Sequence, residues 1–117
     1  MIEAFDCFHT QAYIGGQWLD AMDHSTFDVV NPANDRVIAA VANCGSKETE
    51  QAITAAHGAL ALWSATPAKE RARLMRAWFE IITANAETLA TLLTIEQGKP
   101  FKEAKTEITY GASYIEW

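Results

Sequence analysis

The hydrophobic pattern of this chain changes its period once, near Ser46, and that change limits the folds that the chain can adopt. Before Ser46, apolar residues stand in short runs broken by Gly, Pro, Asn and Asp, which is typical of short strands. After it, apolar residues recur at intervals of three and four, the spacing of amphipathic helices. The sequence therefore predicts a strand-rich segment, residues 1–45, followed by a helical segment, residues 46–117.

Three short stretches of the first segment favour strands. Within residues 13–19, Gly15 and Gly16 stand between aromatic and aliphatic residues, which predicts a tight hairpin turn. Residues 26–30 and 37–42 are further apolar runs that suit strands. A lone hairpin is marginally stable, and its outer edge needs a partner. We therefore expect this segment to join a larger sheet.

Helix start and stop signals divide the second segment into four helices. Ser46 is expected to cap the first helix, and Pro67 to start the second. Asn85 marks the next boundary, and Gly98 followed by Pro100 separates the last two helices. Each expected helix has an apolar stripe that must be buried against another element. The stripes consist of Ala52, Ile53, Ala56, Leu60 and Trp63; Leu74, Trp78, Ile81 and Ile82; Leu89, Leu92 and Leu93; and Ala104, Ile108, Gly111, Ala112 and Ile115.

The composition excludes several classes of protein. The 117 residues, 50% apolar, match one small domain with a real core. Nine basic and 15 acidic side chains give a net charge of -6 without a basic face, which argues against nucleic-acid binding. No apolar run reaches the roughly 18 residues needed to span a bilayer. The acidic start does not match a secretory signal, and two cysteines fit a reducing compartment, so we expect a cytoplasmic protein.

Residues that could carry chemistry are scattered. Neither Cys7 nor Cys44 has a histidine or carboxylate placed to act as its base, which favours structural thiols. His9, His24 and His57 lack partners at metal-ligand spacing, which argues against zinc. The six glycines never form the cluster that a dinucleotide-binding turn needs.

Longer motifs carry a more specific signal. They are NPAND at residues 31–35, TIEQGKP at residues 94–100 and FKEAKTEITYGASYIEW at residues 101–117. Together they resemble the amino-terminal part of the NAD(P)-dependent aldehyde dehydrogenase superfamily, and most closely its succinate-semialdehyde dehydrogenase branch. Glutarate-semialdehyde dehydrogenase is the nearest alternative. The resemblance extends over residues 13–117.

The resemblance implies an α/β aldehyde dehydrogenase fold for the complete enzyme, with residues 1–45 joining the oligomerisation sheet. Residues 46–117 would form the helical part of the cofactor-binding domain, with the chain ending inside a helix. The complete enzyme would be a homo-oligomer that oxidises succinate semialdehyde with NAD or NADP, a step of 4-aminobutyrate degradation. Its catalytic cysteine, its general base and its dinucleotide loop would lie outside this chain. The chain alone is therefore expected to be inactive and to bind no cofactor.

The resemblance also assigns candidate site residues within the chain. The helix around Glu107 and Gly111 would border the substrate entrance. A glycine at 111 would leave room for a substrate carboxylate, which other segments of the family would have to bind. The backbone carbonyls of Val29 and Val30, with the carboxylate of Glu96, would hold a monovalent cation, since hard cations take oxygen ligands.

Simpler interpretations remain open for each of these features. Glu103 and Glu107 lie four residues apart among lysines, which is also typical of a solvated, salt-bridged helix face. Glu96 could end its helix in water or pair with Lys99. Another aldehyde could be the substrate, and the whole chain could instead be a free-standing helical interaction module.

Overall fold

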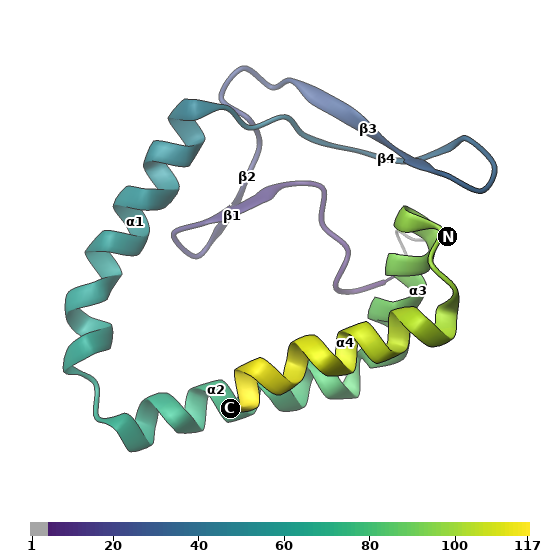
Figure 1. Ribbon diagram of the computed structural model, residues 1–117. Helices are drawn as coiled ribbons and strands as arrows, with labels where there is room; N and C mark the ends of the chain where they lie inside the picture. Colours follow the sequence, from purple (N-terminus) through teal and green to yellow (C-terminus); the bar gives the residue numbers. More distant parts are fainter. Residues whose placement is uncertain (1–4) are drawn as a thin grey trace. The chain divides into compact units, whose positions relative to one another are not determined.

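The computed structural model describes residues 5–117 and contains strands followed by helices, as predicted (Figure 1). Within these residues the elements are β1 (Ala12–Ile14), β2 (Gln17–Leu19), β3 (Thr26–Asn31), β4 (Arg36–Ala42), α1 (Ser46–Ala65), α2 (Ala68–Ala84), α3 (Ala86–Gln97) and α4 (Phe101–Glu116). No described helix combines the length and the apolar character needed to cross a membrane.

The chain divides into two compact units. The first contains the described residues up to Val30 together with Val37–Ala65, so α1 groups with the strands. The second contains Asn31–Arg36 and Thr66–Trp117, which include α2, α3 and α4. The division of roles between residues 1–45 and residues 46–117 stays a prediction.

The first unit contains the predicted hairpin. β1 and β2 pair antiparallel, with Tyr13 opposite Trp18 and their ring centroids 4.9 Å apart. Gly15 and Gly16 have φ angles of 60° and 83°, the positive values that a two-residue hairpin turn requires at both central positions. A side chain on Gly15 would begin 3.7 Å from the Cβ of Ala55, so β1 packs closely on α1.

Strands β3 and β4 form a second two-stranded sheet, which confirms strands in these two stretches. The turn between them is held by side-chain amides. Oδ1 of Asn31 accepts the N–H of Ala33 at 2.9 Å, and Oδ1 of Asn34 accepts the N–H of Arg36 at 3.1 Å. Asn side chains favour such turns because they bond backbone groups two residues ahead.

A buried carboxylate fixes the start of α1. Oε2 of Glu48 accepts the N–H of Gly45 at 2.8 Å, and Oε1 accepts the N–H of Met22 at 2.7 Å. The carbonyl of Gly45 accepts the N–H of Thr49, so Gly45 is the capping position and Ser46 is the first helical residue. The predicted cap at Ser46 is therefore wrong, because Glu48 reaches back to the free amide instead.

Glu48 is 7% exposed. The backbone N–H groups of Met22, of Glu48 itself and of Gly45 hold the pKa of the Glu48 carboxyl below its usual value. The same carboxylate thus caps α1 and ties down the segment that follows β2.

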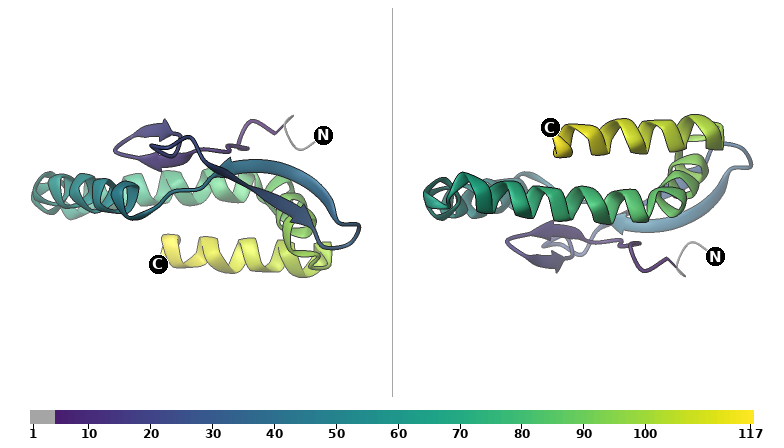
Figure 2. Two further views of the ribbon diagram at one scale, coloured as in Figure 1. Left: turned by 90° about the horizontal axis from the view of Figure 1, so that it is seen from above. Right: turned by 90° about the horizontal axis from the view of Figure 1, so that it is seen from below.

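In the second unit, α4 folds back along α2, with α3 at the turn between them (Figure 2). The buried residues here are small: Ala90 on α3, and Ala104 and Ala112 on α4. Small side chains allow the helix backbones to approach closely. Ile108 and Ile115 are partly buried on the same side of α4, as predicted, but Gly111 is exposed, so its place in the inner stripe is wrong.

The predicted stripe on α2 is also partly wrong. Leu74, Trp78 and Ile81 are exposed, whereas Met75 and Phe79 are partly buried. The helix therefore has apolar side chains on two faces, and α4 covers only one of them. Periodicity favoured the stripe of Leu74, Trp78 and Ile81 because it shows which side chains share a face. It does not show which face packs against another helix.

Gly98 forms the joint between α3 and α4. It has a φ of 72° in the left-handed region, and its N–H donates to the carbonyl of Thr94 at 2.9 Å. Pro100 stands just before α4, as the start signal predicted. A Cβ on Gly98 would lie 3.0 Å from Cγ of Pro32, closer than ordinary packing allows.

Both units leave most of their large apolar side chains exposed or only partly buried. Among the described residues, the buried apolar ones are Ile14, Ala21, Ala90, Ala104 and Ala112, and no large side chain is fully buried. On α1, the predicted stripe residues Ile53, Leu60 and Trp63 are exposed. Apolar surface of this extent is typical of an interface with other polypeptide.

We predict that Gly98→Ala destabilises the chain by about 1–2 kcal/mol, because an L side chain is strained at positive φ and would press on Pro32. Gly111→Ala is the matched control, since an added Cβ there meets nothing within 4 Å. Urea unfolding followed by circular dichroism measures both variants. Equal stability of the two would contradict the proposed strain at Gly98.

We predict that Glu48→Gln lowers the melting temperature and speeds amide exchange at Met22 and Gly45, because a neutral amide is a weaker acceptor than a carboxylate. In the unchanged chain, this stabilisation is complete above the ordinary Glu pKa of 4.5 and is lost as the pH falls through the lowered folded pKa. The variant should lack that part of the pH dependence.

The control for this pair of measurements is Glu50→Gln, which removes an exposed carboxylate from the same helix. It should leave both amides protected. Exchange at Met22 that is as slow in Glu48→Gln as in Glu50→Gln would show that the carboxylate does not hold this segment.

Candidate functional site

The two residues predicted at a substrate entrance lie on one exposed face of α4. Glu107 and Gly111 are one helical turn apart and both are exposed. Glu107 forms an ion pair with Lys99, as expected of a salt-bridged face. The space beside Gly111 is open for at least 4 Å from an added Cβ. The structure thus brings the pair together, and their role at an entrance stays a prediction.

A pair of tyrosines lies on the same face, and sequence analysis did not identify it. Tyr110 and Tyr114 are 62% and 61% exposed, with their rings edge to face at 5.0 Å and their hydroxyls hydrogen-bonded to each other. This hydrogen bond raises the pKa of Tyr114, because the bond stabilises its protonated form. The spacing of four residues between two aromatic side chains was the available signal.

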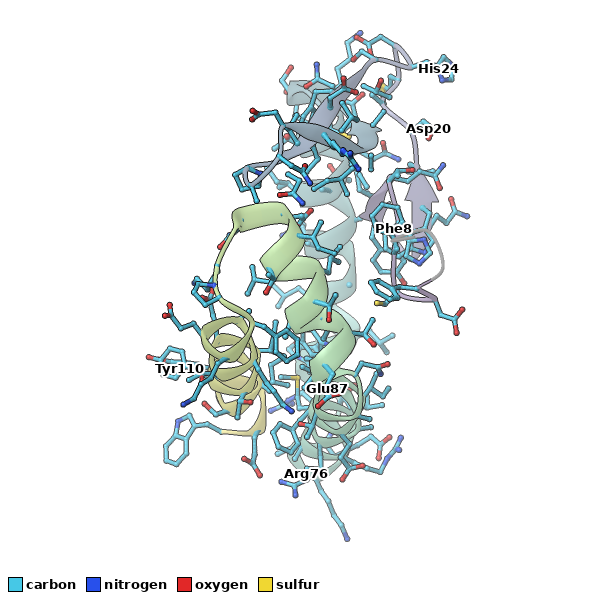
Figure 3. All side chains as sticks on the ribbon, turned by 90° about the vertical axis from the view of Figure 1, so that its right-hand side faces the viewer. Phe8, Asp20, His24, Arg76, Glu87 and Tyr110 are labelled. Atoms are coloured by element: carbon cyan, nitrogen blue, oxygen red, sulfur yellow. The ribbon has the colours of Figure 1, made fainter. Side chains whose placement is uncertain are left out.

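Tyr110 lies between two open grooves on α4 and projects from the helix on the side away from α3 (Figure 3). The first, which we name the α4 groove, has a volume of about 550 Å³ and is lined by Phe101, Lys102, Lys105, Thr106, Thr109, Tyr110 and Ser113. The second has a volume of about 580 Å³ and is lined by Lys99, Lys102, Glu103, Thr106, Glu107 and Tyr110. Lys102, Thr106 and Tyr110 line both grooves.

Two exposed ion pairs join the helices of the second unit. Nζ of Lys105 on α4 lies 2.7 Å from Oε1 of Glu87 on α3, and Arg76 on α2 pairs with Glu116 on α4. Lys105 also lowers the pKa of the Glu87 carboxyl. Because these pairs are exposed, each contributes little to stability.

The residues predicted to hold a monovalent cation belong to different units. Val29 and Val30 lie in β3 within the first unit, whereas Glu96 is exposed near the end of α3 in the second. Lys99, the alternative partner of Glu96, pairs with Glu107. The cation site stays a prediction.

The cysteines and histidines considered in the sequence analysis form no common site among the described residues. Cys7 and Cys44 are exposed free thiols, and within residues 5–117 no hydrogen bond joins either to a histidine or a carboxylate. His9 stacks on Trp18 with ring centroids 3.7 Å apart. Across the described part of the chain, no group of three His, Cys, Asp or Glu side chains is arranged to hold a metal ion.

Comparison with known proteins identifies the class to which this arrangement of strands and helices belongs. Residues 18–117 match the aldehyde dehydrogenase family, and the chain belongs to that family. Among its relatives, a glutarate-semialdehyde dehydrogenase of Pseudomonas putida is 53% identical over 110 residues, which are 94% of this chain and 23% of the relative. The NADP-dependent succinate-semialdehyde dehydrogenase GabD of Escherichia coli is 50% identical over the same shares.

Solved structures agree with this assignment. A crystal structure of an Escherichia coli NADP-dependent enzyme has a TM-score of 0.92 and 50% identity, covering 94% of this chain and 23% of that chain. Succinate-semialdehyde dehydrogenase from Burkholderia pseudomallei has a TM-score of 0.90 and 50% identity, covering 93% and 23%. The chain thus spans about a quarter of the length of its relatives, in their amino-terminal part. The predicted family and fold class are confirmed.

Proposed function

We propose that these residues form the amino-terminal part of an enzyme that oxidises succinate semialdehyde to succinate with NAD or NADP. The observation that carries this proposal is the similarity over nearly the whole chain to relatives named for succinate semialdehyde or glutarate semialdehyde. Both are short aldehydes with a carboxylate at the far end. Glutarate semialdehyde is the alternative substrate, since that relative has 53% identity against 50% for the bacterial succinate-semialdehyde enzyme.

In this proposal these 117 residues supply structure around the site, and the rest of the enzyme supplies the chemistry. The nicotinamide cofactor would accept hydride, and none of the described residues is assigned to bind it, because no glycine-rich turn joins a strand to a helix there. Glu107 and Gly111 would border the path of the aldehyde. The reacting cysteine would come from outside these 117 residues, since Cys7 and Cys44 lack a partner base.

The exposed apolar surface supports completion by further polypeptide. Leu74, Trp78 and Ile81 on α2 would be covered by later segments of the same enzyme. The strands β1 to β4, in two-stranded sheets with unpaired edges, would join a larger sheet that includes a second copy. The complete enzyme is thus proposed to be a homo-oligomer, and its free cysteines fit a reducing cytoplasm.

We predict that the complete enzyme reduces NAD or NADP with succinate semialdehyde, whereas the purified 117-residue chain does not. Absorbance of the reduced cofactor measures both, with glutarate semialdehyde run in parallel to rank the substrates by kcat/KM. Turnover by the isolated chain, free of contaminating enzyme, would show that its own cysteines carry the chemistry. An inactive complete enzyme would refute the proposed function.

We also predict a monovalent cation site formed by the carbonyls of Val29 and Val30 and the carboxylate of Glu96. In the complete enzyme, Glu96→Gln should lower the melting temperature and flatten its dependence on sodium or potassium, because a carboxylate strengthens binding of a hard cation. Glu103→Gln removes an exposed carboxylate from α4 and is the control for the change in charge. The same cation response in Glu96→Gln as in the unchanged enzyme would rule the site out.

A further inference from the structure

The turn between β3 and β4 is held by hydrogen bonds within itself. The carbonyl of Asn31 accepts the N–H groups of Asn34 and Asp35 at 3.3 and 2.8 Å. The side-chain amides of Asn31 and Asn34 accept two further N–H groups of the same turn. Pro32 stands inside this turn, and its ring fixes its own φ angle. The ring of Pro32 is therefore held in one place.

The joint between α3 and α4 rests against this ring. A Cβ on Gly98 would lie 3.0 Å from Cγ of Pro32 and 3.9 Å from its Cβ. Carbon atoms in ordinary contact are about 3.5–4.0 Å apart, so only Cγ would be too close. The turn and the joint belong to the same compact unit. The motifs NPAND and TIEQGKP thus meet where a proline ring faces a glycine.

Helix α4 has a fixed point soon after the joint. Ala104 is 0% exposed, and its N–H donates to the carbonyl of Pro100 at 3.0 Å. Gly111 lies seven residues further along the helix, about 10 Å at 1.5 Å per residue. A shift of the joint at Gly98 therefore tilts α4 about Ala104 and moves Gly111 by a similar distance.

We propose that the ring of Pro32 is a stop for Gly98 and so sets the tilt of α4. This tilt determines where Glu107 and Gly111 lie beside the path of the aldehyde. Pro32 and Gly98 are thus positioning residues that act through α4. The inference rests on the proposed function, which assigns Glu107 and Gly111 to that path, and it gives the NPAND turn a role in the reaction.

A double-mutant cycle in the complete enzyme tests the stop. Gly98→Ala adds the Cβ, whereas Pro32→Ala removes Cγ and leaves the ordinary contact at 3.9 Å. The strain of an L side chain at positive φ is the same in both backgrounds, so it cancels from the comparison. Each enzyme is assayed with succinate semialdehyde through the absorbance of the reduced cofactor.

Gly98→Ala should raise KM for succinate semialdehyde roughly threefold, because small displacements caused far from the chemistry still weaken productive binding. Its kcat should stay nearly unchanged, since the reacting groups are proposed to lie outside these residues. A merely structural defect would lower the amount of active enzyme and the apparent kcat, and would leave KM unchanged. With Pro32→Ala also present, KM should return to the value of Pro32→Ala alone.

Pro67→Ala is the matched control for the rescue, because it removes the ring of another proline that precedes a helix. The carbonyl at this position, which accepts the N–H groups of Glu70 and Arg71, is kept. No atom of Pro67 lies within 4 Å of a Cβ on Gly98, so Pro67→Ala should not restore KM. Gly98→Asn enters the same cycle if Gly98→Ala gives no folded enzyme, since Asn tolerates the left-handed conformation.

The inference is overturned by an unchanged KM in Gly98→Ala, or by an equal rise with and without the ring of Pro32. The second result would show that backbone strain alone sets the tilt. Both results come from an enzyme active on succinate semialdehyde, so they leave the proposed function intact. An unchanged enzyme without activity on either semialdehyde would instead refute the proposed function. The melting temperatures of the same variants then test the stop, and independent effects of the two substitutions would overturn it.

Discussion

The close packing of α4 against α2 and α3 determines which residues of the second unit face outward. Ala104 and Ala112 are buried on one side of α4, which leaves Tyr110 and Glu107 on the opposite side. The joint at Gly98 sets the direction in which α4 leaves α3, since only a left-handed residue ends a helix with this turn. A larger residue at Ala104 or Ala112 would push the helices apart and turn the outer face.

Features that depend on neighbouring residues in sequence could be predicted. The hairpin turn at Gly15 and Gly16 and the joint at Gly98 follow from backbone freedom, which is a local property. Features that depend on distant residues could not. Glu48 caps α1 while it also binds the amide of Met22, 26 residues earlier, and no local signal indicates that second bond.

In the candidate site, too, features set by neighbouring residues could be predicted and features set by distant residues could not. The resemblance assigned Glu107 and Gly111 to one face, and their spacing agrees with it, because four residues make about one turn of a helix. The exposure of Gly111 could not be predicted, because it depends on where α2 and α3 contact α4. Nor could the ion pair between Lys105 and Glu87 be predicted, since it joins two helices that are distant in sequence.

The chain has regular helices but buries almost no large side chain. The fraction of its relatives that the chain spans explains this combination. The chain spans 23% of the length of the Pseudomonas putida relative, and in the function proposed above its apolar faces are covered by further polypeptide. Leu74 and Trp78 on α2 are exposed apolar side chains, and they are costly to leave in water. In the proposed enzyme, such apolar faces are the ones that further polypeptide covers, whereas the salt-bridged face of α4 around Lys99 and Glu107 can remain in water.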